Sequence, residues 1–150
     1  MKDARVCLVT LGIADIARSA AFYAALGWQR TGAGNESVAF LQGEGLVLGL
    51  FGRDDLAEDA HVAFPADSPP APITLAINMP SEAEVDRLYA AALAAGATAT
   101  KPPEKVFWGG YSGYFSDPDG HLWELAHNPF FALDENGHLD LVGNQDEPSA

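Results

Sequence analysis

The alternation of apolar and polar residues predicts the same order of elements twice along the chain. In the first half, the run from Arg5 to Ile13 is rich in Val, Leu and Thr, which indicates a strand. Asp15 is a suitable helix N-cap, and apolar residues then recur at helical spacing until Gly27 ends the helix. Three short strands are predicted next, at Trp28 to Thr31, Glu36 to Leu41 and Leu46 to Phe51. The first half is therefore predicted to be β-α-β-β-β.

The second half repeats this order. Ile73 to Asn78 is predicted to be a strand, and Ser81 followed by Glu84 three residues later is a capping-box signature. Gly96 ends the predicted helix. The remaining strands are predicted at Ala97 to Lys101, Val106 to Ser116 and His121 to Asn128. The chain is thus predicted to be α+β, with two tandem βαβββ modules at about 4–51 and about 72–128.

Two further segments lie outside the repeated pattern. Residues 52–71 carry an acidic run and then several prolines, which disfavour helices and sheet interiors, so we expect a surface linker. After Pro129, Asn136-Gly137 between apolar residues predicts a hairpin, and the chain from about Gln145 is expected to be disordered. We expect residues 1–150 to form a single domain, with this hairpin and tail at 129–150.

Length and composition indicate an ordinary globular protein. The 150 residues, 48% of them hydrophobic, are enough for one domain with a core. No apolar run approaches the roughly 20 residues of a membrane span, so we expect no membrane partner. The first residues do not resemble a signal peptide, and the single cysteine, Cys7, excludes an intrachain disulfide. We therefore expect a cytoplasmic protein.

The formal net charge of −13 restricts the possible partners. It disfavours a nucleic-acid partner, because the phosphate backbone requires a basic surface. It permits a cationic ligand that the field steers toward the protein. Much of the acid lies in predicted loops and tail, so the charge alone does not identify a ligand.

The stretch from Phe107 to Pro129 contains the densest aromatic cluster of the chain. Asp117-Pro118-Asp119-Gly120 is a turn signal between two predicted strands. Alternation along the second of these strands places Leu122, Glu124 and Ala126 on one face. A carboxylate among apolar neighbours is costly unless it is paired. Glu124 is therefore either a strand residue in contact with water or part of a functional site.

The same stretch closely resembles the closing hairpin of the vicinal oxygen chelate superfamily, which contains glyoxalase I, extradiol dioxygenases, fosfomycin-resistance enzymes and bleomycin-resistance proteins. The matching residues are Trp108-Gly109-Gly110-Tyr111, Gly113-Tyr114-Phe115, Asp117-Pro118-Asp119-Gly120-His121, Trp123-Glu124 and Asn128-Pro129. The resemblance implies two βαβββ modules whose curved mixed sheets form a shared cleft. It also implies a homodimer, because family members commonly pair their modules within or between chains and exposed sheet edges invite pairing.

Metal-dependent members of this superfamily bind a divalent ion with residues from the first and last strands of each module. The positions that the resemblance implies here are Leu8, Gly49, Thr74 and Glu124. Only Glu124 is a ligand type, and one carboxylate does not hold a catalytic metal. None of the 4 histidines is predicted to lie where it would replace the missing ligands. We therefore expect no metal and no other cofactor.

The candidate ligand-binding residues are Glu124 in the floor of the cleft and Trp108, Tyr111 and Tyr114 near its mouth. Aromatic rings stack on flat ligands and attract cations. This acidic chain resembles the bleomycin-resistance branch, which binds a cationic, aromatic drug without catalysis or an essential metal. The expected function is metal-independent binding of a small cationic or aromatic molecule. The alternative is a glyoxalase- or dioxygenase-type enzyme (a lyase, isomerase or oxygenase) with an atypical metal site or with Glu124 as general base.

Overall fold

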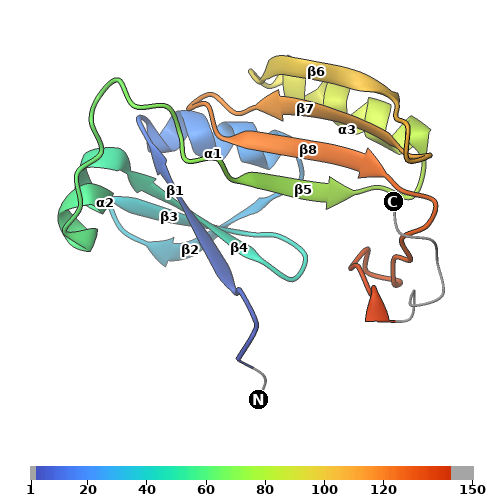
Figure 1. The fold of residues 1–150 in the computed structure, drawn as a ribbon. Helices are drawn as coiled ribbons and strands as arrows, with labels where there is room; N and C mark the ends of the chain where they lie inside the picture. Colours follow the sequence, from blue (N-terminus) through green and yellow to red (C-terminus); the bar gives the residue numbers. More distant parts are fainter. Residues whose placement is uncertain (1–2, 143–150) are drawn as a thin grey trace. The chain divides into compact units, whose positions relative to one another are not determined.

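The protein is described here by a computed structural model of residues 3–142. These residues form two compact units, the first reaching to Ala71 and also including Pro118–Gly120, and the second containing the remainder from Pro72. Each unit contains a four-stranded mixed sheet that does not close on itself (Figure 1). The predicted α+β class with two βαβββ modules is confirmed.

The first unit has the strand order β1-β4-β3-β2, with β1 parallel to β4 and the other neighbours antiparallel. Its elements are β1 (Leu8–Ile13), α1 (Ile16–Ala25), β2 (Gln29–Gly34), β3 (Val38–Gln42), β4 (Val47–Gly52) and α2 (Arg53–Ala60). Asp15 caps α1 as predicted, because its Oδ1 accepts a hydrogen bond from the Arg18 backbone N–H at 2.9 Å. Gly27 follows the helix with φ of 101°, a conformation that favours glycine.

The core of the first unit lies on one face of its sheet. Leu11 and Ile13 of β1 are buried there with Leu48 and Leu50 of β4, and α1 contributes buried aromatic side chains. The alternate residues of β1, including Thr10, lie on the opposite face and are largely exposed. The sheet therefore has one face in the core and an opposite face that α1 does not cover.

The structure differs from the sequence expectation at residues 53–60, which form α2 instead of irregular linker. The prolines that disfavour a helix begin only at Pro65, beyond its end. Leu56 of α2 lies close to Gly12, where a Cβ would be 3.5 Å from Leu56 Cδ2. The guanidinium carbon Cζ of Arg53 lies 5.8 Å from the centre of the Phe64 ring, and Arg53 Nη2 donates a hydrogen bond to the Pro65 carbonyl oxygen at 2.9 Å. These contacts hold a helix that has no buried residue.

The second unit repeats the arrangement, with strand order β5-β8-β7-β6 and β5 parallel to β8. Its elements are β5 (Thr74–Asn78), α3 (Glu82–Ala94), β6 (Thr98–Lys105), β7 (Tyr111–Ser116) and β8 (Leu122–His127). The Ser81 side chain accepts a hydrogen bond from the Glu84 backbone N–H at 3.2 Å, as the capping signature predicts. Glu84 itself pairs with Arg87 Nε at 2.7 Å.

One face of the second sheet packs against α3 (Figure 1). Phe115 and Trp123 stack there with ring centroids 6.4 Å apart, and Tyr89 of α3 meets Phe115 edge to face. Buried Val85 completes the contact from α3. Because side chains alternate along a strand, Glu124 lies on the other face of the sheet.

The second unit and the segment after it differ in two places from the sequence expectation. The stretch Val106 to Ser116, predicted as one strand, contains a turn: the Val106 N–H donates to the Gly110 carbonyl at 3.0 Å, and β7 begins only at Tyr111. The predicted tail hairpin is present as a single antiparallel bridge between Leu133 and Leu139, while the expected disorder from Gln145 lies outside the described residues.

Within residues 3–142, no helix has the length and apolar character needed to cross a membrane.

Candidate functional site

Glu124 lies in the middle strand pair of the second sheet, where its register determines its neighbours. It pairs with Tyr114 on antiparallel β7 and with Ala76 on parallel β5. Residues paired in this way direct their side chains to the same face. Hydrogen bonding with the Glu124 carboxylate raises the pKa of the Tyr114 hydroxyl, and burial and the carboxylate's charge raise it further. Tyr114 therefore stays protonated and acts as a donor toward Glu124.

Three of the residues around this pair are small, whereas Leu122 lies on the same face two residues before Glu124 and Lys101 pairs with Tyr114 from β6. Ala76 is exposed, and Ser112 and Ala126, which pair with each other one step along the same face, are 3% and 5% exposed. Glu124 itself is half-buried. A carboxylate has acceptor sites for several donors, so Tyr114 does not saturate it. The face thus offers a polar pair beside three short side chains.

Tyr111 lies on the opposite face from Glu124. Its hydroxyl donates a hydrogen bond to Asp86 Oδ1 of α3 at 2.6 Å. This bond is the main cause that raises the pKa of Tyr111 to about 12, with smaller contributions from burial and from the charges of Asp86 and Glu82. Tyr111 and Tyr114 are three positions apart on one strand, so alternation already places them on different faces.

Trp108 packs within its own turn. Its ring covers Gly110 so closely that a Cβ at that position would lie 1.7 Å from the ring carbon Cζ3. The structure therefore brings together two of the four predicted ligand-binding residues, Tyr114 and Glu124. It does not bring Tyr111 to their face, and it gives Trp108 a packing contact in the turn.

In the first unit, the positions that the resemblance assigns to metal ligands are apolar or lack a side chain. Leu8 is 45% exposed and pairs with Val47, whereas Thr10 pairs with Gly49, and the Leu8 side chain also reaches the Gly49 position, where a Cβ would be 3.6 Å from Leu8 Cδ1. A Cβ at Gly49 would be 3.0 Å from Thr10 Oγ1. Sequence reasoning missed Thr10, although its place two residues after Leu8 puts both on one face.

In the second unit, Thr74 pairs with Leu122, and Glu124 is the only charged member of the four positions. Across residues 3–142, no group of three or more His, Cys, Asp or Glu side chains is arranged to hold a metal ion. Catalytic metal sites use about three protein ligands. The side chains at these positions therefore do not fit the divalent ion of the metal-dependent members.

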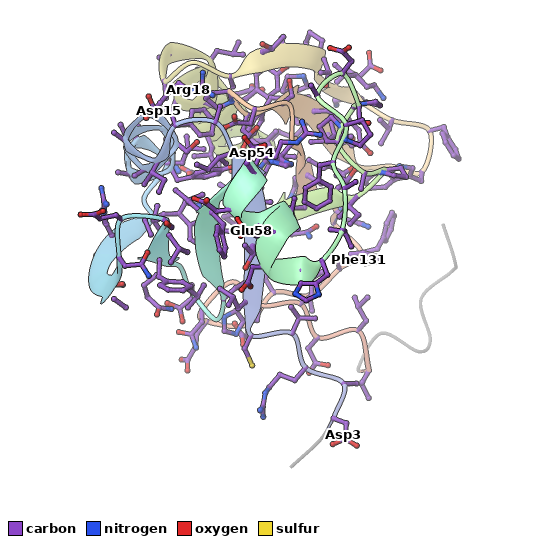
Figure 2. All side chains as sticks on the ribbon, turned by 90° about the vertical axis from the view of Figure 1, so that its left-hand side faces the viewer. Asp3, Asp15, Arg18, Asp54, Glu58 and Phe131 are labelled. Carbon is purple, nitrogen blue, oxygen red and sulfur yellow. The ribbon has the colours of Figure 1, made fainter. Side chains whose placement is uncertain are left out.

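The acidic residues of the Asp117-Pro118-Asp119-Gly120 turn are engaged in structure. Asp117 Oδ1 accepts the His121 backbone N–H at 2.8 Å, which closes the turn. Asp119 Oδ1 accepts from the Ala14 backbone N–H and from Arg18 Nη2, both at 2.9 Å. Figure 2 shows Arg18 and Asp15 at the start of α1. Asp119 thus fixes the turn to the N-terminal end of that helix.

Comparison with known proteins agrees with this geometry. The model of the Glyoxalase/Bleomycin resistance protein/Dioxygenase superfamily matches residues 6–125. The chain belongs to this superfamily. The resemblance found in the sequence is thereby confirmed. A comparison with curated proteins gave no match.

Several solved structures of superfamily members are similar to this chain. A glyoxalase-related enzyme from Fulvimarina pelagi has 37% sequence identity and a TM-score of 0.82, covering 91% of this chain and 97% of that chain. A superfamily enzyme from Burkholderia phytofirmans PsJN has 22% identity and a TM-score of 0.74, over 83% and 98% of the two chains. A lactoylglutathione lyase from Agrobacterium tumefaciens has 20% identity and a TM-score of 0.65, over 85% and 96%. The last two likenesses concern the fold alone.

Proposed function

We propose that this superfamily member binds a small organic molecule with a cationic or aromatic group, on the Glu124 face of its second sheet and without a divalent ion. The observation that carries the proposal is the identity of the side chains at the four positions where metal-dependent members hold their ion. Glu124 is half-buried beside the Tyr114 hydroxyl, whereas the other three positions that the resemblance implies hold Leu8, Gly49 and Thr74. A single carboxylate suits a cation or hydrogen-bond donor better than a metal ion.

Three physical effects would favour such a ligand. A positively charged donor forms a charge-assisted hydrogen bond with Glu124. The ring of Tyr114 adds an attractive surface for a cation or a flat group. The net charge of −13 raises the concentration of cations near the surface and speeds their association.

The first test concerns the metal. Protein purified without chelators should contain no stoichiometric zinc, nickel, iron or manganese by elemental analysis. Added divalent ions should leave its melting temperature unchanged, because ions that bind the folded state raise it. A stoichiometric ion that is lost on Glu124→Ala would contradict the proposal.

The second test concerns the ligand. A calorimetric screen of aromatic amines and their uncharged analogues should give binders among the amines. Glu124→Gln keeps the shape and should weaken them by about 1.5–3 kcal/mol, the range for hydrogen bonds to charged groups. Tyr114→Phe keeps the ring and should cost only about 0.5–1.5 kcal/mol. Glu36→Gln, in the exposed turn before β3, is the matched control and should bind as the parent does.

Equal affinity of the parent and Glu124→Gln for every amine would overturn this proposal. Unfolding of Glu124→Gln would instead assign the carboxylate to the stability of the sheet. Circular dichroism on each variant separates these two results, because only the second changes the secondary structure.

The enzyme alternative has one observation in its favour, the 37% identity to a glyoxalase-related enzyme. In that case Glu124 would act as a general base, and its half-buried position beside Tyr114 would set its orientation. A turnover screen with and without divalent ions tests this, and it includes lactoylglutathione, on which the A. tumefaciens lyase is named to act. Turnover that is lost in Glu124→Gln but retained in Glu36→Gln would favour the enzyme over the binding protein.

A further inference from the structure

We propose a second small-molecule site, separate from the Glu124 face, that takes an uncharged aromatic compound with a hydrogen-bond donor, such as a phenol. The second unit contains a pocket of about 220 Å³ at the carboxyl ends of β5 and β8. Its walls include Asn78, Met79, Pro80, His127, Phe131 and Leu133. Neither Tyr114 nor Glu124 lines it.

The pocket forms because two parallel strands end at the same edge of the sheet. The Met79 backbone N–H donates to the Ala126 carbonyl at 2.7 Å, which carries the pairing one residue beyond β5. The chain then reverses after β8, where Asn128 Oδ1 accepts the Phe130 backbone N–H at 2.9 Å. This turn carries Phe131 and the following residues back as the second wall.

His127 supplies the polar group of the pocket. Its Nδ1 lies 3.0 Å from the Met79 carbonyl oxygen. A carbonyl only accepts, so Nδ1 carries the proton, and Nε2 of the neutral ring is an acceptor. No other hydrogen bond to this ring, and none to the Asn78 side-chain amide, is present within residues 3–142. Both groups remain available to a ligand.

The remaining walls define the class of ligand. They are formed by the Met79 thioether, two proline rings, Phe131 and Leu133, and among residues 3–142 no charged residue lines the pocket. Thioethers and aromatic rings pack favourably against another aromatic ring. The volume is below the roughly 300–1,000 Å³ of sites for drug-sized ligands, which indicates a single ring. A hydroxyl on that ring would donate to Nε2 of His127.

Methionine labelling gives a direct measurement, because the chain has 2 methionines, Met1 and Met79. In protein labelled with ¹³C at the methionine methyl groups, added p-cresol should shift the Met79 signal in a saturable way. Toluene has the same ring without the donor and should bind about 3- to 10-fold more weakly, as expected for one neutral hydrogen bond. The titrations are done under mildly alkaline conditions, in which histidine is neutral.

Two variants separate ligand binding from a purely structural histidine. His127→Asn keeps an amide donor near the place of Nδ1 but removes Nε2, so p-cresol should fall to the affinity of toluene. Leu133→Ala removes apolar wall and should weaken both compounds. The matched control is His61→Asn in the first unit, at an exposed position with φ of 56° that asparagine tolerates, and it should bind as the parent does.

Three results would overturn the second site. The first is the absence of a saturable shift of the Met79 methyl signal with p-cresol. The second is equal affinity for p-cresol and toluene. The third is an unchanged affinity for p-cresol in His127→Asn. Each is read at residues that take no part in the Glu124 proposal, so either proposal can fail while the other holds.

Discussion

Asp119→Ala should destabilise the protein because the Asp119 carboxylate holds the start of α1. Its Oδ1 accepts from the Ala14 backbone N–H and from Arg18 Nη2, both at 2.9 Å, and its Oδ2 accepts from Ser19 Oγ at 3.0 Å. The Asp119 side chain is only 9% exposed, and Ser19 is fully buried at 0%. The substitution removes an acceptor from a buried hydroxyl and from a backbone amide.

The expected loss in the free energy of unfolding follows from these three contacts. The bonds from Ala14 and Ser19 contribute about 1–1.5 kcal/mol each, below the usual range for hydrogen bonds to charged groups, because the first is exposed and the second only partly buried. The Arg18 side chain is 48% exposed, so its ion pair contributes no more than about 1 kcal/mol. We therefore expect Asp119→Ala to lower the free energy of unfolding by about 2–4 kcal/mol. Arg18→Ala should cost only about 0.5 kcal/mol.

The assay is urea unfolding followed by far-UV circular dichroism, with the slope compared among variants to confirm that the same surface unfolds. Asp67→Ala, an exposed acid of the proline-rich segment, is the control and should lie within about 0.5 kcal/mol of the parent. A loss below about 0.5 kcal/mol for Asp119→Ala would refute the reasoning. So would an equal loss in Arg18→Ala, which would make the ion pair, and not the buried bonds, the source of the stability.

Two further predictions concern the second unit. Tyr111→Phe should lower the free energy of unfolding by at most about 1 kcal/mol at neutral pH, because the bond that it removes joins the half-buried Tyr111 to the exposed Asp86. Since the folded pKa of Tyr111 is about 12 against 10.0 normally, the parent's advantage over Tyr111→Phe should be lost as pH rises from 10 to 12, and urea midpoints at several pH values check this. Gly113→Ala should cost more than about 2 kcal/mol, because its Cβ would lie 2.7 Å from Pro103 N of β6. Gly32→Ala is the control, because no atom of the described residues lies within 4 Å of the added Cβ, and equal losses at both glycines would contradict the packing argument.

The sequence by itself determined most of the elements, because their signals are local. The N-caps at Asp15 and Ser81 each bond a backbone N–H three residues on, as their spacing predicts. The glycines that end α1 and α3 have positive φ, which few other residues adopt. The order of the two βαβββ modules and the α+β class follow from such short-range patterns, whereas α2 was missed and the superfamily came from the resemblance of the stretch from Phe107 to Pro129. Strand alternation also placed Glu124 on the face away from Trp123 and Leu125.

Other features depended on residues far apart in the chain. Asp119 and Ser19 are 100 residues apart in the sequence, so no local pattern near either residue predicts their hydrogen bond. The neighbour of Gly49 is Thr10 because of the register between β1 and β4, which the packing of whole strands sets. The pocket at His127 exists because β5 and β8 are parallel and end together. Local propensity selects helices and strands, but only the packed fold decides which side chains meet, since that choice depends on the burial of all of them at once.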